Sequence, residues 1–156
     1  MHDIRYIKAE IEDAETVFKM VQNTIISIYP KYYPKEVVDF FCDLHSKERI
    51  TNDIIDGNVR LLMIGDIPVG TGSYKEDHIT RLYVSPDHQG KGYGTFIMDK
   101  LEVEIAKKHD TVSLDASLPA SIMYEHRGYK TVRHERWECE NGVMLVYEIM
   151  EKKVRK

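Results

Sequence analysis

The chain has 156 residues, 42% of them hydrophobic and 31% charged, and a formal net charge of −4. This length suits a single domain spanning residues 1–156 and makes a second catalytic domain unexpected. The negative charge argues against nucleic-acid binding, which needs a basic surface, and no apolar run approaches the roughly 18 residues of a membrane span.

The N-terminal segment argues against secretion, and the scattered cysteines and histidines argue against disulfides and a metal site. Residues 1–6 contain no apolar core or cleavage site of a secretory signal, so we expect a cytoplasmic protein. Cys42 and Cys139 are isolated, which is typical of reduced thiols in the cytosol. The seven histidines include no pair four residues apart, and we therefore expect no metal. The basic segment 151–156 is expected to be a solvated tail, and both a monomer and a homodimer stay open.

The first third of the chain predicts one strand followed by helices. Alternating apolar residues over 4–9 indicate a strand. Asp13 is expected to cap a helix that carries apolar residues at helical spacing from Val17 to Ile28. Pro34 is expected to begin a second helix over 35–45, and residues 46–56 favour a short third one.

The remaining two thirds predict a sheet interrupted by helices. Segments 59–64 and 67–74 indicate a hairpin, and a strand over 79–84 follows. A helix is then expected to about residue 109, followed by a strand over 110–116 that must run parallel to the earlier one. A short helix from Pro119 to Gly128 and a terminal hairpin over 129–150, with an Asn-Gly turn, complete the pattern. The predicted fold is α/β (α+β mixed), a mixed sheet of about seven strands with helices on both faces.

A glycine-rich loop between the strand 79–84 and the following helix predicts an anion site. Gly90, Gly92 and Gly94 lack a Cβ, so several backbone N–H groups can approach a ligand closely. The start of the helix adds unpaired N–H groups and a positive dipole end, and Lys91 adds a full charge. A P-loop is excluded because Gly92, not Ser or Thr, follows Lys91, and a dinucleotide fingerprint is weak because Thr95 takes its last position.

Two motifs resemble those of the GCN5-related N-acetyltransferase (GNAT) family. Gln89-x-x-Gly92-x-Gly94 is similar to the Q/R-x-x-G-x-G/A signature, and residues 117–129 are similar to N-x-x-A-x-x-x-Y-E-x-x-G-F. In the second motif Tyr124, Glu125 and Gly128 match, whereas Tyr129 replaces the usual Phe. The resemblance covers roughly residues 58–149 and implies the GNAT fold and acetyl-CoA as cosubstrate.

The resemblance also implies which residues bind acetyl-CoA. The loop would hold the pyrophosphate through Gln89, Gly90, Lys91, Gly92, Tyr93, Gly94 and Thr95. A bulge would splay the preceding strand, where the N–H of Leu82 would donate to the acetyl carbonyl, Val84 would pair with the pantetheine amides, and Tyr83 lies between them. Ser117 stands where many members carry an asparagine that touches pantetheine. Ser117 and Ser121 are therefore candidates for this contact, although either can instead cap the helix that Pro119 begins.

Catalysis requires an acid for the departing thiolate and a base for the amine. In the family a tyrosine at the position of Tyr124 protonates the thiolate, and a phenol stays protonated at neutral pH. The position of the family's usual glutamate base is taken by His78, whose ordinary pKa suits proton acceptance. Glu76 and Asp77 compete with it through water, and all three can instead form a solvated turn.

Aromatic residues of the N-terminal third are candidates for the acceptor pocket. Tyr32 and Tyr33 lie between two prolines and are expected to contact a substrate amine by cation–π interaction, unless they belong to the core. The sequence therefore predicts an acetyl-CoA-dependent N-acetyltransferase that acts on a small-molecule amine. A protein or peptide N-acetyltransferase and a non-catalytic acyl-CoA sensor stay open as alternatives.

Overall fold

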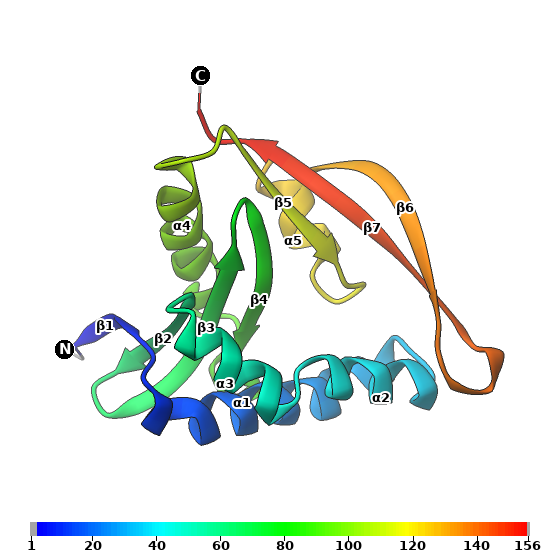
Figure 1. Cartoon of the computed structure of the whole chain (residues 1–156), viewed down its shortest axis with the longest axis horizontal. Helices are drawn as coiled ribbons and strands as arrows, with labels where there is room; N and C mark the ends of the chain where they lie inside the picture. Colours follow the sequence, from blue (N-terminus) through cyan, green and yellow to red (C-terminus); the bar gives the residue numbers. More distant parts are fainter. Residues whose placement is uncertain (1–2, 156) are drawn as a thin grey trace.

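The computed structural model describes residues 3–155, which form a seven-stranded mixed sheet with the strand order β1-β2-β3-β4-β5-β7-β6 (Figure 1). The predicted mixed sheet with helices on both faces is thus confirmed. The strands are β1 Ile4–Lys8, β2 Val59–Ile64, β3 Ile67–Lys75, β4 His78–Val84, β5 Thr111–Ala116, β6 Lys130–Glu138 and β7 Met144–Lys153. The α-helices are α1 Ala14–Ile28, α2 Lys35–Leu44, α3 Lys47–Ile55, α4 Tyr93–Ala106 and α5 Ser121–His126. Short 3-10 turns are η1 Ile11–Asp13, η2 Tyr29–Lys31, η3 Pro86–His88 and η4 Glu140–Gly142.

Two hydrophobic clusters cover the two faces of the sheet. On one face, α1 and α3 bury apolar residues such as Val21 and Ile50 against β2 and Tyr83 of β4. On the other face, α4 buries the predicted stripe of Ile97, Leu101 and Ile105. Because these stripes recur every three or four residues, each helix presents one apolar side to the sheet. Helices α1 to α3 accordingly lie along one side of the molecule and α4 on the other (Figure 1).

A β-bulge in β4 changes which face its side chains point to. Tyr74 pairs with Ile79 but Ser73 pairs with Arg81, so Thr80 is the extra residue. Such an insertion breaks the alternation of side chains. Ile79 therefore packs in the cluster around α4. Arg81 and Tyr83 instead point toward the face covered by α1 and α3.

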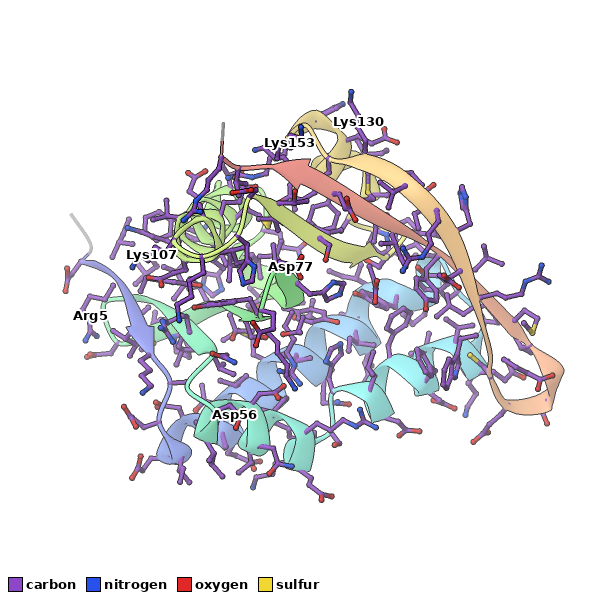
Figure 2. All side chains as sticks on the ribbon, turned by 45° about the horizontal axis from the view of Figure 1, so that its top comes forward. Arg5, Asp56, Asp77, Lys107, Lys130 and Lys153 are labelled. Carbon is purple, nitrogen blue, oxygen red and sulfur yellow. The ribbon has the colours of Figure 1, made fainter. Side chains whose placement is uncertain are left out.

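Strands β4 and β5 pair only briefly before they diverge. Their parallel pairing consists of His78 with Ser113 and Ile79 with Leu114, next to the β3–β4 turn whose Asp77 carbonyl accepts from the Ser113 N–H. Figure 1 shows the two strands separating beyond this point, and Figure 2 shows Asp77 near their joined end. Along its other edge β5 pairs with β7 over its full length. The divergence is the splay that the family resemblance implies.

Local details differ from the sequence prediction at three places. Asp13 does not cap α1 with its side chain, because its Oδ2 accepts from the Glu10 N–H in the preceding 3-10 turn. Helix α5 begins at Ser121, two residues after Pro119. The expected tail is wrong for residues 151–153, which continue β7 as far as Lys153 (Figure 2), while Lys156 lies outside the described residues. No helix within 3–155 combines the length and apolar character needed to cross a bilayer.

Candidate active site

The glycine loop forms an open cradle at the start of α4. Gly90 and Gly92 have φ values of +78° and +84°, and a Cβ added to either would meet no atom within 4 Å. Gly92 is the N-cap of α4, so the N–H groups of the first helical turn have no partner within the helix. These donors and the helix dipole favour an anion above the loop.

A cavity of about 210 Å³ lies over this cradle. Its lining includes six residues of the loop and the turn before it: His88, Gln89, Gly90, Gly92, Tyr93 and Gly94. Lys91 and Thr95 are exposed and lie outside the lining. The cavity thus brings together five of the seven predicted loop residues and leaves Lys91 and Thr95 outside its lining.

A second cavity of about 600 Å³ continues from the first along the open edge of β4. The two share Leu82, Val84, Gln89 and Ala120, so they form one continuous surface. The Gln89 side chain donates from Nε2 to the Val84 carbonyl at 3.0 Å and joins the loop to the end of β4. This shape suits a ligand that has a diphosphate at one end and an extended arm.

The backbone of β4 faces this opening with hydrogen-bonding groups that its pairing with β3 does not use. The Ser85 N–H donates to the Val69 carbonyl at 2.8 Å. Because hydrogen-bonded pairs alternate in an antiparallel ladder, Arg81 and Tyr83 also bond to β3, whereas Leu82 and Val84 point their N–H and C=O groups toward β5. The residues present therefore fit the pantetheine arm and thioester of acetyl-CoA.

Tyr124 lies where this opening meets α5. Its side chain is 6% exposed, lines the larger cavity and packs edge-on against Tyr129. Burial raises the pKa of Tyr124 above its ordinary value, so the hydroxyl stays protonated at neutral pH. Tyr29 and Tyr83 line the same cavity, and the Tyr29 hydroxyl donates to that of Tyr83 at 3.5 Å.

Two of the three candidate bases, His78 and Glu76, occupy different environments. His78 lines the larger cavity, with Nδ1 at 2.8 Å from the Ser113 hydroxyl and Nε2 at 3.7 Å from Asp115 Oδ2. Glu76 lies in the β3–β4 turn with a side chain that is 79% exposed, and its carboxylate is 3.8 Å from His109 Nε2. The structure brings His78 to the cavity and leaves Glu76 outside its lining.

The serine and tyrosine candidates also differ in whether they line the larger cavity. Ser117 lines the larger cavity, while the Ser121 hydroxyl donates to the Leu118 carbonyl at 3.3 Å and lines neither cavity. Neither side chain caps α5. Tyr32 is exposed and lines the larger cavity, whereas the Tyr33 hydroxyl accepts from the Leu118 N–H at 2.7 Å and ties α2's leading loop to the loop after β5.

A charged cluster on the cavity wall was not predicted from the sequence. Arg81 is 5% exposed and donates to Asp53 Oδ2 at 2.6 Å and to His45 Nδ1 at 3.0 Å, and all three residues line the larger cavity. The available signal was an arginine between Ile79 and Tyr83, at an inward position of the predicted strand. His45 and Asp53 carry no such signal, because tertiary packing alone brings them to β4.

Three comparisons place this geometry among known proteins. The model of the acetyltransferase (GNAT) domain matches residues 28–153. The uncharacterized N-acetyltransferase YafP of Escherichia coli (strain K12) is 28% identical over 96 residues, which are 62% of this chain and 61% of YafP. The match thus spans about three fifths of the length of that relative.

Solved structures share the fold over nearly the whole chain. A GCN5-related N-acetyltransferase from Rhodopseudomonas palustris superposes with a TM-score of 0.83 at 26% identity, covering 98% of this chain and 96% of the other. The PaiA N-acetyltransferase from Thermoplasma acidophilum, solved with coenzyme A, gives a TM-score of 0.74 at 21% identity, covering 97% and 99%. Among the described residues, no group of three His, Cys, Asp or Glu side chains is placed to hold a metal.

Proposed function

Since the chain belongs to the acetyltransferase (GNAT) domain family, we propose that it transfers an acetyl group from acetyl-CoA to a primary amine of a small molecule. The observation that carries this proposal is the continuous opening from the glycine loop, past Leu82 and Val84 of β4, to Tyr124. A binding loop without this opening would hold a diphosphate but would give no access to a thioester.

Backbone groups of the loop and of β4 would hold the cosubstrate. The N–H groups between Gln89 and Thr95 would donate to the diphosphate, as helix N-termini do for phosphate in general. The N–H of Leu82 would donate to the acetyl oxygen, which gains negative charge as the amine nitrogen attacks the carbonyl carbon. One such fixed donor contributes about 3 kcal/mol to transition-state stabilisation.

Two side chains would move the protons. As the bond between carbonyl carbon and sulfur breaks, the Tyr124 hydroxyl would give its proton to the departing sulfur. His78, which lines the cavity and whose Nδ1 contacts the Ser113 hydroxyl, would take a proton from the ammonium group of the acceptor through water, and the neutral amine nitrogen would then attack. Glu76 is less suited to this step, since it lies outside the cavity lining.

The size of the cavity favours a small acceptor. Ligand sites for small molecules measure about 300–1,000 Å³, and part of the 600 Å³ here must receive the thioester end of acetyl-CoA. The remaining cavity volume suits a small amine rather than a folded protein surface. Tyr29 and Tyr32 from the loop after α1 would form one wall of this space.

The test is release of free thiol from acetyl-CoA with panels of amines, amino acids and peptides. We expect turnover with at least one small amine, and a loss of about 100-fold or more in kcat for Tyr124→Phe with unchanged acetyl-CoA affinity. Tyr6→Phe is the matched control, because it removes a buried hydroxyl that lines neither cavity. Full activity of Tyr124→Phe would eliminate the acid role, turnover with peptides alone would favour a protein acceptor, and silence with every acceptor would favour an acyl-CoA sensor.

A further inference from the structure

The Arg81 cluster, which consists of His45, Asp53, Ser73 and Arg81, leaves one end of a buried guanidinium unused. Nη1 of Arg81 contacts Asp53 at 2.6 Å and Ser73 at 3.5 Å, and Nε donates to His45 at 3.0 Å. Across residues 3–155 no acceptor lies within hydrogen-bond reach of Nη2. The side chain is 4% exposed and lines the larger cavity, and Nη2 is not among the fully buried unpaired atoms, so a molecule in the cavity can accept from it.

His45 adds a second donor to the same wall. Because Nδ1 accepts from Arg81, the proton of the neutral ring sits on Nε2. The described chain offers no hydrogen-bond acceptor to this Nε2, and the residue lines the cavity although it is only 6% exposed. Burial and the neighbouring guanidinium lower the pKa of His45, so the neutral ring offers Nε2 as a donor.

The charges on the cavity wall fall into two groups. Arg81 and Asp53 offset each other, and the exposed Arg49 lines the same cavity without an ion pair to any residue of 3–155. Asp115, beside His78, is a separate acidic member of the lining. The wall near Arg49 and Arg81 therefore favours an anion, and the wall near Asp115 favours an ammonium group.

We infer that the acceptor carries a carboxylate as well as the amine that is acetylated, as an amino acid does. The inference deepens the proposed function and depends on it for the role of the amine. A planar carboxylate matches the flat, charged donor set of a guanidinium, and charge-assisted hydrogen bonds of this kind discriminate strongly. Arg81 directly precedes Leu82, so a carboxylate at the Arg81 cluster lies within the length of a small molecule from the acetyl carbonyl.

The first experiment compares amino acids with their amides and with the corresponding decarboxylated amines in the thiol-release assay. We expect kcat/KM to be at least about tenfold higher for the carboxylate form, because its loss leaves buried donors unpaired. Equal rates for the three forms, or a preference for di- and polyamines, would overturn the inference and leave the proposed acetyl transfer intact.

Variants of the cavity wall test which residues produce the preference for carboxylates. Arg49→Gln removes the exposed charge and should lower the preference for carboxylates severalfold, whereas Arg81→Lys keeps the charge, loses the forked donors and should abolish the preference. Arg133→Gln is the control, since Arg133 is exposed on β6 and lines neither cavity. Circular dichroism and a thermal melt establish that each variant is folded, and an unchanged preference in both cavity variants contradicts the proposal.

A binding measurement separates this inference from the proposed function. Isothermal titration of the coenzyme A-bound protein with the same amino acids, amides and amines needs no turnover. If no acceptor releases thiol, the acetyl-transfer proposal fails. In that case amino acids that bind the parent at least about tenfold more tightly than Arg81→Lys still support the anion site, and the absence of such binding refutes it.

Discussion

His45 makes the stability of the fold sensitive to acid. Burial, with Arg81 and Arg49 as further causes, lowers the pKa of His45 from 6.5 to about 3. A folded pKa below the unfolded one means that the unfolded chain binds the extra proton first, so the free energy of unfolding falls as the pH drops below about 6.5. Between about pH 8 and pH 5 this single group should remove about 2 kcal/mol.

The substitution His45→Gln tests this reasoning. A glutamine oxygen can still accept from Arg81 but does not titrate, so the variant should be less stable at neutral pH yet lose about 2 kcal/mol less than the parent on acidification. Urea unfolding at the two pH values measures both free energies. His126→Gln, at an exposed position on α5, should keep the slope of the parent. Equal acid losses in the parent and in His45→Gln would refute the argument.

Two further substitutions probe the loop and the interior. Gly92→Ala places a side chain at a φ of +84°, so it should cost about 1 kcal/mol of stability and also weaken coenzyme A binding in a titration, whereas Gly142→Ala at +73° should cost the same without affecting binding. Arg127→Gln leaves Glu102 without its guanidinium partner at 2.8 Å and should cost about 2 kcal/mol in urea unfolding, while the exposed Arg133→Gln should cost little. Equal coenzyme A affinity in both glycine variants, or equal stability in both arginine variants, would contradict these expectations.

The elements that the sequence predicted well are those whose signals are local. The stripe of α4, the hairpin of β2 and β3 and the terminal Asn-Gly turn each depend on residues a few positions apart. The glycine loop is of the same kind, because Gly90 and Gly92 lack a Cβ and adopt positive φ without a steric penalty. For this reason the cosubstrate could be predicted from a short motif.

The bulge at Thr80 shows why the Arg81 cluster was not predicted. Simple alternation in β4 would put Ile79, Arg81 and Tyr83 on one face. The inserted residue moves Ile79 to the opposite face, and nothing in the sequence marks the position of the insertion. His78 could be named as a candidate because counting back from Gln89 identifies it, and it lines the cavity whereas Glu76 stays in the turn.

The two substrate sites of the proposed reaction therefore depend on the sequence in different ways. Coenzyme A would be recognised by one continuous loop, but the proposed acceptor wall joins residues far apart in the chain, such as Arg81 with His45 and Asp53. A substitution in α3, for example at Arg49, can change the wall without touching the loop. Acceptor preference can therefore diverge between relatives while the glycine motif stays recognisable, so the acceptor has to be argued from the charges of this cavity.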